Sequence, residues 1–378
     1  MAVEAASVPL AGRLGPAYLI RAGRLAARAQ EDIRAASLPP EAAVMTSGSL
    51  LADRRLEYAR AFHDAGEADA AISLLEQAVG LAPDWPEGHF LLGEWCASAG
   101  RRDDAVAAYA RCLALDPADR LGAIIRLALL GAAPPPATLP PAYVAAVFDE
   151  YAPRFDTTLL QALDYRVPAL LGAALTSSLD SDNRIGAVLD LGCGTGLAGE
   201  RFRQHATWLE GVDLSHAMVR EAERRGVYDM LHVEDILGFL GRAMRRYDLV
   251  LAADVLGYVG EAAPLFAAVA KVLAPGGRFA FSAEQGDGDG FVLTAGHRFA
   301  HGEAYLNVQA EAAGLSVESI EPIVCRFEAG APVAGLLMVA RSPIKRAAPI
   351  DRAKAPLGEQ AGIEDGIVEA LDAPRAGQ

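Results

Sequence analysis

The chain is poor in features that would assign it to a compartment or a membrane class. It has four cysteines in 378 residues, and they lie far apart, so neither a disulfide framework nor a cysteine metal site is indicated. No uncharged apolar run reaches the length of a membrane span. The start, Met1-Ala2-Val3-Glu4, lacks a basic segment followed by an apolar run. We therefore predict no secretory signal and a cytoplasmic protein.

Positive charge is also scarce. Lys and Arg number 34 against 49 Asp and Glu, which gives a formal net charge of −15. Such a surface repels phosphate backbones, so we do not expect a nucleic-acid partner, and only a local basic patch would change this. Apolar residues make up 52% of the chain, so the chain as a whole is not intrinsically disordered. The length favours two domains over one.

An internal repeat with a period of 34 residues occupies residues 51–130. Similar residues recur at this period: Pro83 and Pro117, Gly66 and Gly100, Ala71 and Ala105. The period and the closing prolines resemble the tetratricopeptide repeat, a helix-turn-helix unit. Cys96 and Cys112 fall at core positions of the second unit, and Leu121 to Leu130 would form a last, capping helix. Repeats of this kind imply recruitment of a protein or a carrier-bound substrate.

The rest of the chain divides by composition. We expect a leader helix and flexible segment at 1–50, a proline-rich linker at 131–141, a second domain with an N-terminal lid at 142–342 and a disordered tail at 343–378. The leader helix, Ala17 to Ala36, carries scattered arginines. It could pack or stay solvated, or it could lie on a membrane or a partner.

The most informative stretch is VLDLGCGTGL, residues 188–197. It indicates a buried strand that runs into a glycine-rich turn, and Asp213 closes the next strand 21 residues after Gly192. Glycines let a ligand approach the backbone, and an acid in this position can bind ribose hydroxyls. The spacing is G-x-G-x-G and not that of a dinucleotide site. Asp190 in the turn would repel a pyrophosphate but would suit an ammonium group.

From about Ile185 to Arg341 this turn and later segments resemble the class I S-adenosylmethionine-dependent methyltransferases, and LAPGGRF at 273–279 is typical of them. The resemblance implies an α/β fold: a Rossmann-like sheet with helices on both faces, here preceded by an all-α tetratricopeptide-type domain. The segments 148–156 and 297–301 support a closer match to a group of bacterial repeat-containing predicted methyltransferases.

The resemblance implies S-adenosyl-L-methionine as cofactor. The residues that would bind it are Asp190, Gly192, Cys193, Gly194, Gly196, Asp213, Leu214, Met218, Asp235, Ile236 and Asp254. In this scheme Asp213 binds the ribose, Asp235 receives the adenine amino group and Asp254 lies beside the sulfonium. The alternative for Asp213 is a helix N-cap, although Ser215 could fill that role.

Methyl transfer from a sulfonium needs a positioned acceptor and little water, and only a weak base or none. The candidate bases are His297, His301, Tyr258 and Tyr151, all in segments expected at the carboxyl edge of the sheet. The histidines could instead orient a substrate or cap a helix. Tyr151 and Phe155 would share one face of a lid helix if Pro153 does not break it; an ordinary packing helix is the alternative.

The stretch after the fourth strand narrows the acceptor. Methyltransferases of exocyclic amines carry Pro-Pro and an aromatic residue there, whereas this chain has Asp254-Val255-Leu256-Gly257. DNA bases and protein glutamine are therefore not expected. No carboxylate set for a metal can be assembled, and residues 285–290 indicate a flexible loop and not a calcium site. We expect a methyltransferase for a small-molecule or carrier-bound acceptor; the alternative is a non-catalytic repeat scaffold.

Overall fold

The computed structural model describes residues 46–159, 163–176, 184–328 and 330–344, all within one compact unit. The expected leader helix and the expected tail from residue 345 onward lie outside the described residues. Among the described residues, none of the helices has the length and apolar character needed to traverse a bilayer.

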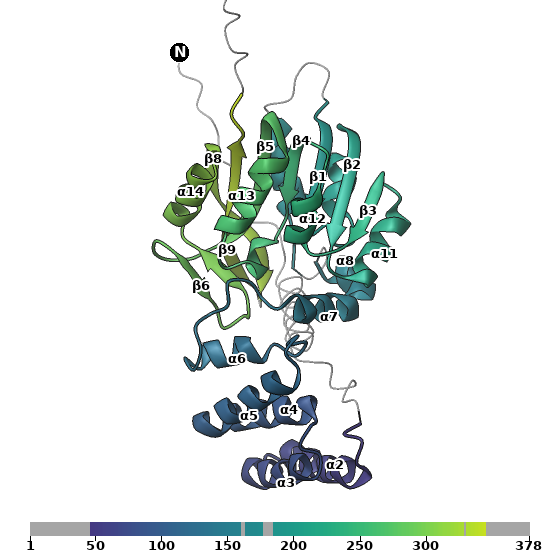
Figure 1. The fold of residues 1–378 in the computed structure, drawn as a ribbon, viewed down its shortest axis with the longest axis vertical. Coiled ribbons are helices and arrows are strands. Elements are labelled where there is room, and N and C mark those ends of the chain that lie inside the picture. The colour runs from purple at the N-terminus through teal and green to yellow at the C-terminus, as the bar shows by residue number, and fades with distance from the viewer. Residues whose placement is uncertain (1–45, 160–162, 177–183, 329, 345–378) are drawn as a thin grey trace, which may run out of the picture. The chain divides into compact units, whose positions relative to one another are not determined.

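The repeat region consists of helices α2 to α6, each packed on the next (Figure 1). Their bounds are α2 (Leu50–Asp64), α3 (Ala68–Leu81), α4 (Pro86–Ser98), α5 (Arg102–Leu115) and α6 (Ala123–Leu129). Gly66 and Gly100 follow α2 and α4 with φ of +78° and +76°, so the repeated glycine supplies the left-handed residue between paired helices. Cys96 and Cys112 are buried in this core, as predicted.

The second domain is built on one sheet of nine strands among the described residues. The strands are β1 (Gly186–Leu191), β2 (Ala206–Asp213), β3 (Met230–Val233), β4 (Tyr247–Ala252), β5 (Leu273–Gln285), β6 (Phe291–Leu293), β7 (Phe299–His301), β8 (Ser316–Glu328) and β9 (Ala331–Arg341). The order β3-β2-β1-β4-β5 is parallel throughout. Strand β9 then joins β5 antiparallel and pairs with β8 in the final hairpin.

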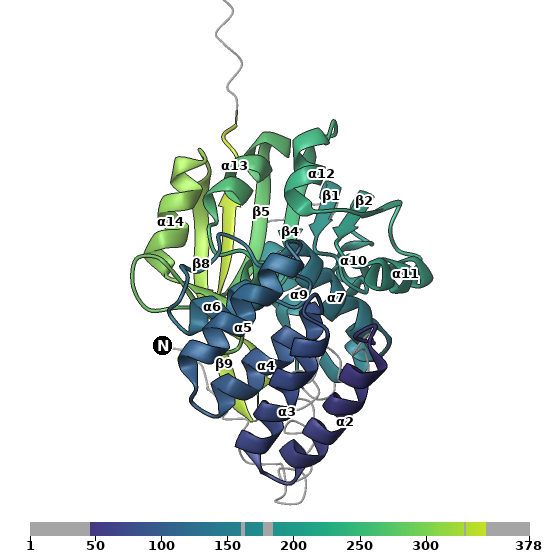
Figure 2. The same cartoon turned by 60° about the horizontal axis from the view of Figure 1, so that its bottom comes forward.

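Helices cover both faces of this sheet (Figures 1 and 2). One apolar core holds α12 (Ile236–Arg242), α13 (Ala263–Val272) and α14 (Glu303–Ala312) against the sheet, and another holds α9 (Val167–Thr176) and α10 (Leu197–Phe202). Helix α11 (His216–Arg225) contacts β2 and β3. The Rossmann-like class I methyltransferase architecture, preceded by an all-α domain, is the predicted fold. Parallel strands place the ends of β1, β2 and β4 at one edge, where ligands bind in such sheets.

The segment predicted to form a lid, called the lid below, lies beside that edge. It consists of α7 (Pro141–Tyr151), the 3₁₀ helix η3 (Ala152–Arg154) and the short α8 (Phe155–Thr157). Pro153 does interrupt the α-helix, yet the rings of Tyr151 and Phe155 still meet edge to face, 5.4 Å apart. Asp149 accepts hydrogen bonds from Ser215 Oγ (2.6 Å) and from the Ala217 amide (2.9 Å) at the start of α11.

Two segments between the main elements make backbone hydrogen bonds that the sequence analysis did not predict. The linker bonds to the chain after β4, because the Leu139 amide donates to Tyr258 O and the Gly260 amide donates to Ala137 O, both at 2.9 Å. The hairpin of β6 and β7 was not predicted. It follows the loop at 285–290 and extends the carboxyl end of β5, to which β7 pairs in parallel.

Candidate active site

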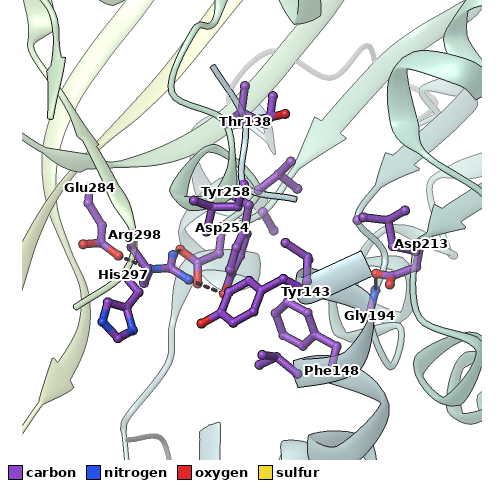
Figure 3. A pocket seen from close by; sticks show the side chains of 18 of the residues that line it. Thr138, Tyr143, Phe148, Gly194, Asp213, Asp254, Tyr258, Glu284, His297 and Arg298 are labelled. Atoms are coloured by element: carbon purple, nitrogen blue, oxygen red, sulfur yellow. Dashed lines mark hydrogen bonds and ion pairs between the residues drawn. The ribbon is translucent and has the colours of Figure 1, made fainter. Parts of the chain in front are cut away.

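A cavity of about 1260 Å3 opens at the carboxyl edge of the sheet. The glycine turn, the lid, the β6–β7 hairpin and the repeat region all contribute to its lining. Figure 3 shows Asp213 and Gly194 on one side of the view, and Arg298 and His297 on the other, with Tyr258, Tyr143 and Phe148 between them.

The glycine turn is closed by Asp213. One carboxylate oxygen accepts from the Gly194 amide and the other from the Ser215 amide, both at 2.9 Å. Ser215 caps α11 by accepting from the Met218 amide, so the N-cap alternative for Asp213 is excluded. Gly192 has φ +62°, and a Cβ there would lie 2.6 Å from Val255 Cγ2, so only glycine fits without a shift. Burial raises the pKa of Asp213.

Asp190 is the penultimate residue of β1, just before this turn. It is fully buried, and Oδ2 accepts a hydrogen bond of 2.7 Å from Tyr228 OH. Oδ1 has no hydrogen-bond partner among the described residues, although Asp190 lines the cavity. Burial raises the pKa of this carboxyl to about 7. A buried oxygen of this kind suits a donor brought by a ligand.

Some of the other residues proposed to bind the cofactor line the cavity, and some do not. Leu214, Asp235, Ile236 and Cys193 line the cavity. Asp235 also caps α12 by accepting from the Gly238 amide at 2.9 Å, a role the sequence analysis did not assign. Burial raises the pKa of the Cys193 thiol well above its usual range, so this residue contributes shape and not a thiolate.

The other two residues proposed to bind the cofactor lie away from the cavity lining. Gly196 and Met218 are not among the described residues that line the cavity. Gly196 caps α10 with φ +94°. Met218 is buried with Ala152 and Ala217 between α11 and the lid, because the lid covers the face of α11 that Met218 occupies.

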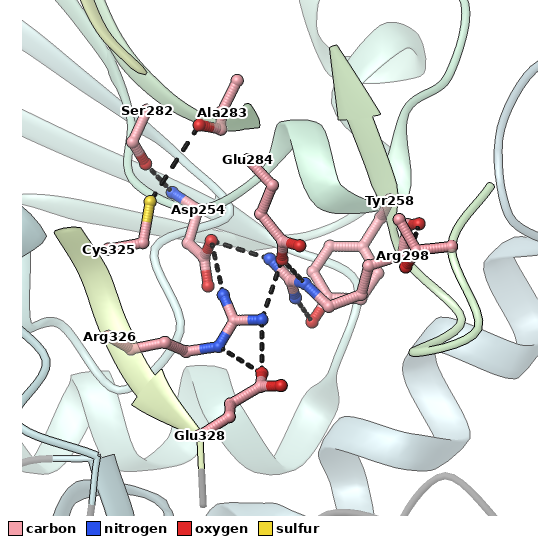
Figure 4. Close-up of polar contacts among 10 residues, drawn as sticks. Asp254, Tyr258, Ser282, Ala283, Glu284, Arg298, Cys325, Arg326 and Glu328 are labelled. Carbon is pink, nitrogen blue, oxygen red and sulfur yellow. Dashed lines mark hydrogen bonds and ion pairs between the residues drawn. The ribbon is translucent and has the colours of Figure 1, made fainter. Parts of the chain in front are cut away.

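The end of the cavity that contains Arg298 holds an arginine–carboxylate cluster (Figure 4), whose members are Asp254, Glu284, Arg298, Arg326 and Glu328. Arg298 Nη2 lies 2.7 Å from Asp254 Oδ1, and Arg326 Nη2 lies 2.8 Å from Glu284 Oε1. Burial opposes ionisation of Glu284, but the two guanidinium groups outweigh it and lower its pKa to about 2. Asp254 is thus paired with Arg298.

Family comparisons match both parts of the chain. Residues 188–277 match the family described as Methyltransferase domain, and residues 86–119 match Tetratricopeptide repeat. The chain carries a methyltransferase domain and a tetratricopeptide repeat.

The similar proteins resemble parts of the chain. Methyltransferase-like protein 27 of Homo sapiens is 35% identical over 85 residues, which are 22% of this chain and 34% of that protein. The chain thus spans about a third of this curated relative. Among solved structures, magnesium protoporphyrin IX methyltransferase from Synechocystis PCC 6803 with bound SAH gives a TM-score of 0.43 at 19% identity, covering 53% of this chain and 99% of that one. N-methyltransferase NodS from Bradyrhizobium japonicum WM9 gives 0.38 at 20% identity, covering 47% and 85%.

Three of the four candidate bases line the cavity of the methyltransferase domain: Tyr151, Tyr258 and His297. Tyr258 OH accepts a hydrogen bond from Arg298, and burial raises the pKa of this phenol to about 12. Tyr258 is therefore a neutral phenol at neutral pH.

His301 is a correction. The structure places it in the interior and not among the described lining residues, with Nε2 bonded to Val259 O (2.9 Å) and Gly260 O (3.1 Å). Carbonyls only accept, so Nε2 carries a proton, and burial lowers the pKa of the ring. Because β7 alternates its side chains, His301 points into the packing of the hairpin and not into the cavity.

His297 has a partner that sequence reasoning missed. It occupies the tip of the β6–β7 hairpin, and Nδ1 lies 3.1 Å from Nη1 of Arg126 on α6. Arg126 in turn pairs with Glu94 Oε1 at 2.8 Å. No short-range motif signals this contact, since 171 residues separate its two ends.

Proposed function

We propose that this protein transfers a methyl group from S-adenosyl-L-methionine to a small-molecule or carrier-bound acceptor, as an enzyme of class EC 2.1.1.-. One observation carries the proposal: two buried carboxylates flank the glycine turn, Asp213 held by the Gly194 amide and Asp190 with one oxygen unpaired among the described residues. An adenosyl compound with an ammonium group offers each carboxylate a matching donor.

The residues present fit this cofactor. Asp190 would accept from the ammonium group, Asp213 would accept from the ribose hydroxyls, and Asp235, Ile236 and Leu214 would surround the adenine. When bound, the cofactor supplies a methyl group already activated on a positively charged sulfur. The chain needs only to hold the acceptor in line and exclude water.

The residues that line the cavity support these roles, in which the cofactor supplies the methyl group and the protein positions the acceptor. Tyr143, Phe148 and Tyr258 line it between the turn and the hairpin, and the lid aromatic Phe148 stacks edge to face on Tyr258 at 5.3 Å. Tyr258 keeps its proton, so it orients the acceptor by hydrogen bonding and does not deprotonate it. The helical repeats recruit the acceptor or its carrier.

The test is a calorimetric titration that measures the binding of S-adenosylhomocysteine to the wild-type protein and to Asp213→Ala. We expect saturable binding that weakens by about 10- to 100-fold in the variant, because a charged hydrogen-bond acceptor contributes about 1.5–3 kcal/mol. Asp103→Ala is the matched control, since the side chain of Asp103 is 98% exposed. Absence of saturable binding to the folded wild type would favour a non-catalytic repeat scaffold.

A further inference from the structure

The last helix of the repeat region shares a core with the methyltransferase domain. Ile125 of α6 is fully buried in an apolar cluster with Leu139 of the linker and with Leu293 and Phe299 of the β6–β7 hairpin. The side chain that follows, Arg126, lines the cavity together with Glu94 of α4. The repeat region is therefore one wall of the active site.

Arg126 is held in place by the repeat region. Its side chain is 6% exposed, and its Nε donates to Glu94 Oε1 at 2.8 Å. Glu94 also accepts from Tyr109 OH at 2.6 Å, and the guanidinium lies over the ring of Phe90, 5.4 Å from the centroid. A buried arginine with these contacts has little rotational freedom.

The contact between Arg126 and His297 sets the tautomer of the imidazole. A guanidinium has donors only, so Nδ1 of His297, 3.1 Å from Arg126 Nη1, must accept. The single proton of the neutral ring is then on Nε2. Such a ring donates a hydrogen bond from Nε2 and cannot take a proton there.

The backbone at His297 supports a positioning role. Its φ is +58°, a left-handed value that is strained for a non-glycine residue. The turn is closed by bonds from the His297 amide to Thr294 O (2.9 Å) and from the Thr294 amide to Arg298 O (2.8 Å). The hairpin thus holds the imidazole against Arg126 at the cost of backbone strain.

At the end of the cavity near His297, the positive charges are matched or outnumbered by negative ones. Arg126 is matched by Glu94, and the two arginines of the arginine–carboxylate cluster face its three carboxylates. Glu261 adds a further acid to the described lining. A carboxylate or phosphate on the acceptor would be repelled here, whereas an uncharged group between aromatic walls would not.

We infer that the repeat region completes the acceptor subsite. Arg126 is a positioning residue that fixes His297 as an Nε2–H donor, and the subsite takes an uncharged, largely apolar acceptor whose hydroxyl or carbonyl oxygen receives this hydrogen bond. The inference rests on the proposed function for the meaning of "acceptor", but the Arg126–His297 pairing can be tested without turnover.

The first experiment is nitrogen NMR of the full-length protein with 15N-labelled histidine, with His297 assigned by loss of its signals in His297→Gln. We expect an unprotonated Nδ1 and a protonated Nε2 in the wild type, and loss of this preference in Arg126→Met. A protonated Nδ1 in the wild type, or an unchanged ring in Arg126→Met, would overturn the inference.

Arg126→Met leaves Glu94 without its buried partner and could unfold the protein. The double variant Glu94→Gln/Arg126→Met removes both charges, and replacing a buried ion pair as a unit is commonly tolerated. The same loss of tautomer preference is expected in the double variant, and an unchanged ring there contradicts the pairing.

The second experiment titrates phenol and benzoate into the protein saturated with S-adenosylhomocysteine, while the His297 ring signals are followed. Phenol should shift Nε2 at concentrations at least about tenfold below benzoate, because the lining disfavours an anion. The phenol effect should be lost in Arg126→Met. Equal or tighter binding of benzoate would refute the uncharged class. Failure of S-adenosylhomocysteine itself to bind would instead count against the proposed function, and the tautomer result would stand.

Discussion

Asp190 is a carboxylate buried beside a turn built mainly from backbone groups. Burial raises its pKa to about 7, from about 3.9 in solution, so the folded free protein favours the protonated acid. Its contribution to stability is fully present below about pH 4 and is lost as the pH rises to about 7. A ligand with an ammonium group requires the ionised form.

The affinity for S-adenosylhomocysteine should therefore rise with pH between 6 and 8. The expected slope approaches tenfold per pH unit well below about pH 7, because binding there must release the Asp190 proton. Calorimetric dissociation constants across this range give the measurement. Asp190→Asn should bind weakly with a flatter profile, and an equally steep profile in that variant would assign the titration to another group, such as Asp213.

Gly192 illustrates how one missing side chain shapes the site. Gly192→Ala should destabilise the fold by about 1–2 kcal/mol through its left-handed φ alone, and its Cβ would also press on Val255. Denaturant unfolding measures the loss. Gly226→Ala is a matched control, since φ is +69° there with nothing within 4 Å of a Cβ. Equal losses of unfolding free energy in both variants would show that the space around Gly192 does not matter for stability.

At the scale of elements, two carboxylates in the C-terminal half of the lid hold it against the rest of the domain. Asp149 binds the start of α11, and Asp156 accepts from Thr195 Oγ1 and pairs with Arg225. Because Thr195 belongs to the glycine turn, these contacts connect the lid directly to the proposed cofactor site.

Asp149→Ala should loosen the lid and speed release of S-adenosylhomocysteine by about tenfold, since about 1.5–3 kcal/mol is expected from hydrogen bonds to a charged group. Stopped-flow displacement measures the rate. Glu150→Ala, on the same helix and facing Arg154 at 3.9 Å, is the control. Release rates that match in the two variants would mean that the lid does not gate the site.

Elements with a strong local signal were predictable. The alternation of strand and helix from β1 to β5 follows from apolar runs and turn residues. The β6–β7 hairpin was not predicted because its strands have three residues each, and the loop that precedes β6 is rich in glycine. Such short strands are stabilised by neighbours, here β5 and α6, and not by their own pattern.

For the whole molecule, the shared cluster around Ile125 makes the repeat region and the methyltransferase domain mutually dependent. Removing residues 1–130 would expose that cluster, so such a truncation tests folding as much as recruitment. A single buried change is a sharper probe.

Ile125→Ala should cost about 2–5 kcal/mol and should raise amide hydrogen exchange in β6, β7 and α7, because these elements share its cluster. Hydrogen exchange with mass spectrometry locates the effect. Leu81→Ala on α3, where the side chain is 45% exposed, is the control. Exchange confined to the repeat region in Ile125→Ala would mean that the two parts are not coupled.

The amino-acid sequence was sufficient to predict the features that depend on residues close together in the chain. A glycine-rich turn, the acid 21 residues beyond it and a 34-residue period each reflect backbone geometry that adjacent residues impose. Partners far apart in the chain were different. The Arg126–His297 contact and the arginine–carboxylate cluster join segments from three or more elements, and only the packing of α6, the hairpin and β8 brings them together. The spacing of residues along the chain does not indicate such contacts. Their energy comes from burial that is shared by elements which meet only in the folded chain.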